Sequence, residues 1–188
     1  MKPNFQSLGK INGGFMRELF VIDKKNYIEN GTIGRRPSVR GIVIKDGKIA
    51  MMHSLKYDYY KLPGGGIEEG EQLEDTLMRE VREESGLIVK KESIKEFGYV
   101  RRIEKGKIED IFIQENYYFL CDVEEMLQAQ ELDDYEEEEQ FTLEFVTPEQ
   151  AIEVNENADH GDKTDSQTFA GMILRENKVL QIIKAEIM

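Results

Sequence analysis

The sequence has little of the residue types that join a chain covalently or anchor it in a bilayer. Cys121 is the only cysteine among 188 residues, so no intramolecular disulfide can form and a reducing compartment is favoured. Tryptophan is absent, and no run of about 18 apolar residues exists. With two histidines far apart, a zinc site is disfavoured. These absences predict a cytoplasmic protein with no membrane partner.

Basic residues are also in the minority. Lysine and arginine number 25 against 38 aspartates and glutamates, which gives a formal net charge of −13. The average field of such a surface repels a phosphate backbone, so general nucleic-acid binding is excluded. A small phosphorylated ligand remains compatible with this charge, because a bound divalent metal reverses the local sign.

The length and the 39% hydrophobic fraction suit one globular domain. We expect a loose N-terminal tail over residues 1–15 and a single domain over residues 16–188. The segments 17–23 and 25–30 alternate enough to predict a short hairpin. A second hairpin is predicted around Asp46–Gly47, because Asp-Gly is a strong signal for a tight turn.

The centre of the chain predicts a helix. Leu73, Leu77 and Val81 recur every four residues within 71–85, and Gly86 follows where a left-handed cap is common. The remaining expected elements are strands at 38–44, 48–54, 93–104, 108–123 and 141–146, a loop at 126–139, and helices at 147–154 and 167–185. This order favours an α/β sandwich around a mixed sheet.

Three carboxylates share one face of the predicted helix. At about 100° per residue, Glu80, Glu83 and Glu84 lie together near the edge of the apolar stripe, where like charges destabilise the helix. A hard divalent cation with oxygen ligands would compensate, and Mg²⁺ or Mn²⁺ is the usual ion beside phosphates. The glycines at 64–66 permit a backbone that points a carbonyl at such a metal or that lets the loop pack against the helix.

The same stretch resembles the Nudix box, the pattern G-x5-E-x7-R-E-U-x-E-E-x-G-U with U an aliphatic residue. All nine defined positions are filled at the right spacing, over 23 residues. They are Gly65, Glu71, Arg79, Glu80, Val81, Glu83, Glu84, Gly86 and Leu87. The order of strands around the box resembles the Nudix αβα sandwich with a central mixed β-sheet.

The resemblance implies a Mg²⁺- or Mn²⁺-dependent hydrolase. Such enzymes cleave the pyrophosphate of a nucleoside diphosphate linked to another moiety, by attack of water on phosphorus. By resemblance, Glu83 and Glu84 are the main metal ligands, the Gly65 carbonyl and Glu80 are further candidates, and Arg79 orients the glutamates. Metal polarises phosphoryl oxygens and lowers the pKa of bound water, and a glutamate then takes the proton.

The acidic run that ends at Glu139 offers one more candidate. In the family the general base comes from the box or from a later loop, and Glu139 is the best-placed residue here for a base or a further metal ligand. A solvated acidic loop is the alternative, since charge runs are commonly that. At the level of the whole chain, a nucleotide- or sugar-nucleotide-binding module without turnover is the alternative to an enzyme.

Residues outside the box should select the substrate, a small nucleotide. Arg36 and Arg40 could bind phosphates and so could Arg101, with surface charge as the equal alternative. Tyr60 could stack on a base, although tyrosines in such a segment more often pack. The N-terminal hairpin could pair with a second subunit, which would give a homodimer. The sequence leaves the nucleotide itself open.

Overall fold

The fold is built around a mixed five-stranded sheet in the computed structural model, which describes residues 10–11 and 14–188. Two long central strands pair antiparallel, and each outer strand runs parallel to the central strand beside it. The strands are β3 (Glu18–Asp23), β4 (Ile33–Arg35), β5 (Ser38–Ile42), β10 (Lys95–Glu104) and β11 (Ile111–Leu120). Both β4 and β5 lie beside β11, and β3 lies beside β10.

A smaller antiparallel sheet follows directly from the large one. Its strands are β6 (Ile44–Lys45), β7 (Lys48–Ser54), β8 (Tyr59–Lys61) and β13 (Phe141–Val146). The predicted Asp46–Gly47 turn is confirmed, because both residues have positive φ and Lys45 pairs with Lys48 across it. Two short ladders complete the strands: β1 (Lys10–Ile11) with β2 (Gly14–Phe15), and β9 (Leu87–Val89) with β12 (Val123–Leu127).

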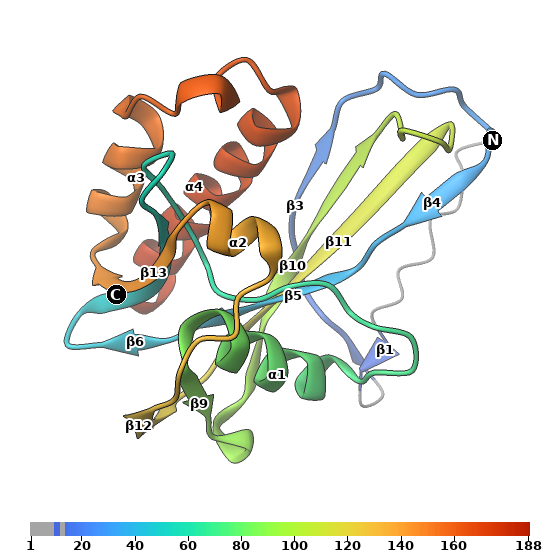
Figure 1. Cartoon of the computed structure of the whole chain (residues 1–188). Coiled ribbons are helices and arrows are strands. Elements are labelled where there is room, and N and C mark those ends of the chain that lie inside the picture. The colour runs from blue at the N-terminus through green and yellow to red at the C-terminus, as the bar shows by residue number, and fades with distance from the viewer. Residues whose placement is uncertain (1–9, 12–13) are drawn as a thin grey trace.

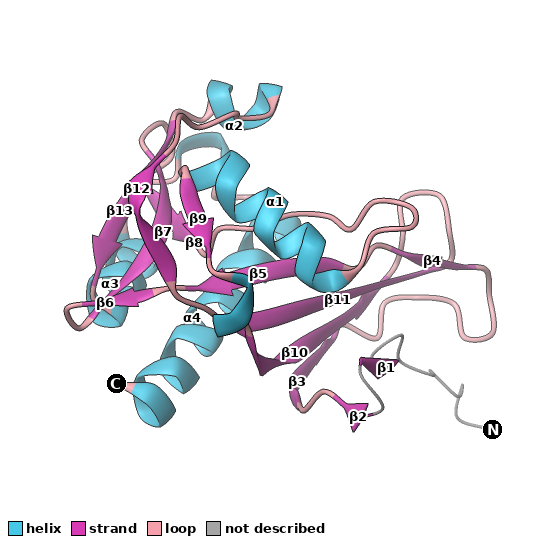
Figure 2. Ribbon diagram, turned by 90° about the horizontal axis from the view of Figure 1, so that it is seen from below, coloured by secondary structure: helices cyan, strands magenta, loops and turns pink. Residues whose placement is uncertain are grey.

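Helices cover both faces of the large sheet. They are α1 (Leu73–Ser85), α2 (Asp134–Glu138), α3 (Pro148–Asn157) and α4 (Gln167–Ile187), with 3₁₀ turns η1 (Lys91–Ser93) and η2 (Gly161–Lys163). Figure 1 shows α3 and α4 together on one side and α1 on the other, and Figure 2 shows α1 lying across the strands. The predicted α/β sandwich with a mixed sheet is confirmed.

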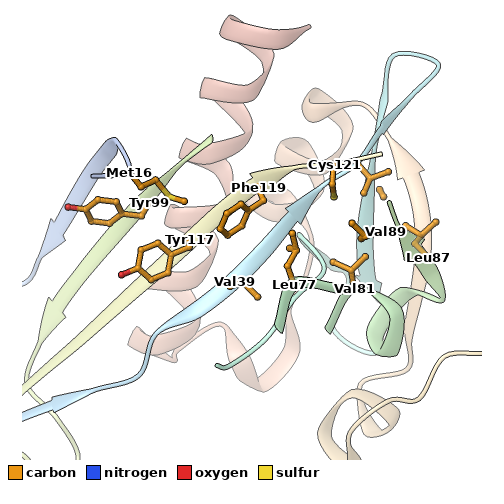
Figure 3. Packing of buried hydrophobic residues seen from close by; sticks show 12 residues of the cluster. Met16, Val39, Leu77, Val81, Leu87, Val89, Tyr99, Tyr117, Phe119 and Cys121 are labelled. Carbon is orange, nitrogen blue, oxygen red and sulfur yellow. The ribbon is translucent and has the colours of Figure 1, made fainter. Parts of the chain in front are cut away.

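Side-chain alternation along β11 divides the core into two parts. Tyr117 and Phe119 pack in one buried cluster with Leu77 and Val81 of α1, as Figure 3 shows. Tyr118, between them in sequence, packs in the other cluster with side chains of α4. The α1 face of the sheet therefore carries the helix of the Nudix-like motif, and α4 closes the opposite face.

Three expectations differ from the structure or lie outside it. The hairpin at 17–30 is wrong: β3 pairs parallel with β10, and residues 24–32 contain no strand. The loop at 126–139 is wrong in part, because α2 forms within it. The loose tail falls mostly on residues 1–9 and 12–13, which are outside the described residues.

Candidate metal and pyrophosphate site

The loop that precedes α1 is fixed along the edge of β5. The Gly41 N–H donates to the Pro63 carbonyl and the Val39 N–H to the Gly65 carbonyl, each at 2.9 Å. A single bridge between Ser38 and Gly66 extends this ladder. The Gly65 carbonyl, predicted as a metal ligand, therefore already accepts one hydrogen bond and keeps one lone pair.

Two glycines are required by close approaches in this loop. Gly64 has a φ of 135°, and a Cβ there would collide with the Val39 carbonyl oxygen. A Cβ on Gly65 would instead collide with Oε2 of Glu80. The absence of a side chain at Gly65 thus lets the Glu80 carboxylate lie directly against the loop backbone.

The helix α1 turns its carboxylates toward this loop because its apolar stripe is buried beneath it. Leu77 and Val81 are fully buried against the sheet, and Gly86 ends the helix in the left-handed conformation with a φ of 75°. Its N–H donates to the Arg82 carbonyl at 2.8 Å. Both features of the predicted helix are confirmed, with the first residue at Leu73 rather than Glu71.

Arg79 is the hub of the carboxylate cluster. Its guanidinium forms a bidentate pair with Glu71, at 2.7 and 2.8 Å, and also contacts Glu80 at 2.8 Å and Glu83 at 3.1 Å. The hydrogen bonds from Arg79 hold the pKa of Glu71 well below its usual range, at about 2. One arginine therefore orients three glutamates, the arrangement that the resemblance implies.

A second set of contacts links Glu84 to the later acidic run. Lys61 Nζ lies 2.8 Å from Glu84 Oε1 and 3.0 Å from Glu136 Oε1. The other oxygen of Glu84 accepts the Gly64 N–H at 2.9 Å. Lys61, Glu84 and Glu136 are each at least nine-tenths buried, so a compact ionic group forms beneath the glycine loop.

The pKa values of Glu84 and Glu136 are shifted in opposite directions. Burial raises the pKa of Glu84 to about 7, although the Lys61 charge opposes the rise. Burial also raises the pKa of Glu136, but donors on Glu84, Lys61 and Tyr135 outweigh it and lower this pKa to about 2. Burial raises the pKa of Glu80 as well.

Sequence reasoning selected Glu139, whereas the structure brings Glu136 to the box. Asp133 and Glu136 form a capping box that starts α2 and turns Glu136 inward. Glu139 accepts from the Tyr59 hydroxyl at 2.7 Å and from Lys163, at the far end of the short helix. The pattern Asp133-x-x-Glu136 is the signal that could have found both the helix and the residue.

The predicted substrate residues are distributed over both sheets. Arg36 lies beside the glycine loop, because a Cβ added to Gly66 would come within 3.8 Å of the Arg36 Nε atom. Arg40 Nη1 contacts the Gly64 carbonyl. Arg101 lies on β10, 3.0 Å from the Tyr99 hydroxyl. Tyr60 is apart from the cluster: its hydroxyl donates to Glu144 at 2.8 Å and its ring stacks on His53.

The donor set suits a hard divalent cation in its chemistry. Glu80, Glu83, Glu84 and Glu136 offer only oxygen, and the glycine loop adds backbone carbonyls. Within residues 10–11 and 14–188, no three acidic, histidine or cysteine side chains yet converge on one point, because Arg79 and Lys61 hold the carboxylates. These carboxylates are the candidate ligands of a metal ion, and in this structure Arg79 and Lys61 neutralise them.

Comparison with known proteins decides the family. The model of the NUDIX domain matches residues 34–167, which include the loop, α1 and α2. The chain belongs to the NUDIX domain family. A curated relative, the ADP-ribose pyrophosphatase of Methanocaldococcus jannaschii, is 40% identical over 78 residues, or 39% of this chain and 46% of that protein. The NUDIX chain thus matches less than half of that relative's length.

Solved structures resemble the NUDIX chain in fold. The ORF135 protein of E. coli has a TM-score of 0.52 at 19% identity, with 82% of this chain and 94% of that chain covered. The mutator MutT protein of Bacillus halodurans has a TM-score of 0.51 at 18% identity, covering 75% and 84%. A NUDIX hydrolase from Nitrosomonas europaea has a TM-score of 0.51 at 13% identity, covering 76% and 90%.

Proposed function

We propose that this NUDIX protein is a pyrophosphohydrolase that requires Mg²⁺ or Mn²⁺ and cleaves a nucleoside diphosphate linked to another moiety. The observation that carries the proposal is the carboxylate cluster of Glu80, Glu83, Glu84 and Glu136 against the glycine loop. Like charges at this density are costly without a cation. The name of the partial relative, ADP-ribose pyrophosphatase, supports the same class of substrate.

The family resemblance and the contacts around Arg79 and Lys61 support the following roles. Glu83 and Glu84 would be the principal ligands of the ion, and Glu80, the Gly65 carbonyl and Glu136 would be further candidates. When bound, the ion polarises the phosphoryl oxygens and lowers the pKa of water. Arg79 keeps three glutamates in position, as its short contacts indicate.

Water attacks one phosphorus, the bond from that phosphorus to the bridging oxygen breaks, and two phosphorylated products leave. A carboxylate of the cluster takes the proton of the attacking water. Arg36 is placed to bind a substrate phosphate, because it lies beside the loop and is exposed. Arg40 supports the loop from behind through the Gly64 carbonyl.

A hydrolysis screen tests this function. The chain is incubated with Mg²⁺ or Mn²⁺ and ADP-ribose, UDP-glucose, diadenosine tetraphosphate or a nucleoside triphosphate, in ¹⁸O-labelled water, and products are read by mass. We expect two phosphorylated products, one of them labelled on phosphorus, and loss of turnover with EDTA. Tight binding without turnover of any of them would instead favour the binding module.

A further inference from the structure

Three buried polar atoms on the α1 side of the large sheet lack a hydrogen-bond partner among the described residues. They are Nε of Arg101, Oε1 of Glu115 and the hydroxyl of Tyr117. Glu115 is 2% exposed and Tyr117 is 1% exposed. Buried polar groups are normally paired, so three orphans in one place require an explanation.

Glu115 is the most unusual of the three. Its two nearest cations are Arg35, at 3.4 Å from Oε2, and Arg101, at 3.5 Å from Oε1. Charge-assisted hydrogen bonds are normally about 2.7–2.9 Å long, so neither contact replaces the water that this carboxylate has lost. A donor from outside the protein would satisfy Glu115 better than its present neighbours do.

The orphans belong to a larger polar group, which we call the sheet-face cluster. The Tyr99 hydroxyl donates to Glu18 at 2.9 Å and lies 3.0 Å from Arg101 Nη2. Figure 3 shows the hydroxyl ends of Tyr99 and Tyr117 pointing away from Leu77 and Val81 of α1. The sheet-face cluster consists of Glu18, Arg35, Tyr99, Arg101, Glu115 and Tyr117.

Sheet register places this cluster within reach of the site. The Gly65 carbonyl accepts from Val39, Val39 is the register partner of Tyr117, and Tyr117 is the partner of Tyr99. Two strand spacings therefore separate Gly65 from Tyr117, or about 10 Å. A ligand whose diphosphate lies at the glycine loop can extend its linked group over this face.

The composition of the cluster selects the chemistry of that group. Two carboxylates balance two guanidiniums, so the cluster offers no net positive charge for a further phosphate. The rings of Tyr99 and Tyr117 lie against each other at 5.7 Å, and Arg101 covers Tyr99 at 5.5 Å, which leaves these faces occupied against a stacking base. Free acceptor and donor atoms side by side suit hydroxyl groups, which both donate and accept.

We propose that the sheet-face cluster binds the hydroxyls of a sugar joined to the nucleoside diphosphate, with Glu115 accepting and Arg101 and Tyr117 donating. The substrate class is then a sugar-linked nucleoside diphosphate. This inference rests on the proposed function for the position of the diphosphate. It adds residues on β10 and β11 that determine specificity without taking part in bond cleavage.

Calorimetry with two uncleavable ligands tests the inference. The α,β-methylene analogues of ADP-ribose and ADP differ by the terminal ribose, and neither can be cut at the bridge between the two phosphorus atoms. With Mg²⁺ present, we expect the wild type to bind the ADP-ribose analogue about tenfold more tightly than the ADP analogue. Glu115→Gln and Tyr117→Phe should remove most of this difference and leave the affinity for the ADP analogue unchanged.

Tyr118→Phe is the matched control, because Tyr118 carries an equally buried hydroxyl on the opposite face of β11. The Tyr118→Phe variant should keep the full difference in affinity between the two analogues. The inference is overturned if the wild type shows no difference between the analogues, if Tyr117→Phe keeps that difference, or if it weakens both analogues equally. Binding here needs no turnover, so failure of the hydrolysis screen and failure of this test remain distinguishable.

Discussion

The ammonium of Lys61 lies 2.8 Å from a carboxylate oxygen of Glu84, and the two side chains expose only 6% and 4% of their surface. Such a pair is costly to break by removing one partner, because the other charge then remains buried. Lys61 also contacts Glu136, so it joins the box helix to α2. The acidic helix α2 therefore contacts the candidate site through Glu136 and is not a solvated loop.

The first prediction compares alanine substitutions at two neighbouring glycines, Gly65 and Gly66. Gly65→Ala should lower kcat/KM by about 100-fold, because its Cβ occupies the position of Glu80 Oε2 and displaces that carboxylate. Gly66→Ala is the control: its Cβ meets nothing closer than 3.8 Å. Steady-state rates and melting temperatures of both variants check this. Equal rates would show that the position of Glu80 is unimportant for turnover.

The second prediction concerns which glutamate of the acidic run serves the site. Glu136→Gln should reduce kcat by about 10- to 100-fold, because Glu136 contacts Lys61, which also contacts Glu84. Glu139→Gln should leave kcat within about twofold and instead lower stability by about 2 kcal/mol, through weaker bonds to Tyr59 and Lys163.

Urea unfolding and initial rates, measured on the same preparations, distinguish these outcomes. The reverse pattern, in which Glu139→Gln loses activity and Glu136→Gln does not, would restore the residue that sequence position favoured. Loss of activity in both variants without loss of stability would mean that the whole acidic run contributes to the site.

The third prediction uses the metal alone. Mg²⁺ at about 100 times its dissociation constant should stabilise the fold by about 3 kcal/mol and raise the melting temperature by about 5–10 °C. The double variant Glu83→Gln with Glu84→Gln should lose this shift. Glu138→Gln should keep it, because Glu138 is exposed and pairs with Lys56. Differential scanning fluorimetry with and without EDTA measures the shift, and its persistence in the double variant would place the ion elsewhere.

The sequence predicted the parts of the site that depend on local spacing. The helix repeat places Arg79, Glu80 and Glu83 relative to one another. The glycine loop directly precedes this helix, so its position beside these residues also depends on residues that are close in sequence. Glu136 was missed because its contact with Lys61 joins residues 75 positions apart. The pairing of β3 with β10 was missed for the same reason, since a parallel partner leaves no turn signal between the strands.

The last prediction concerns the pair of Glu71 with Arg79, which fixes the loop to the helix. Glu71→Gln should lower the free energy of unfolding at pH 7 by about 2 kcal/mol, because a bidentate charged contact becomes a weaker neutral one. The pKa of Glu71 is lowered from 4.5 to about 2 in the folded protein, chiefly by the Arg79 hydrogen bonds. The stabilisation is therefore fully present above pH 4.5 and is lost as the pH falls toward 2.

Urea unfolding of the wild type and of Glu71→Gln from pH 7 to pH 2 should show the difference in unfolding free energy shrinking between pH 4.5 and pH 2. Glu69→Gln, at an exposed position in the same loop, is the control and should show no such dependence. A difference that stays constant down to pH 2 would mean that the carboxylate charge of Glu71 is not what holds the loop.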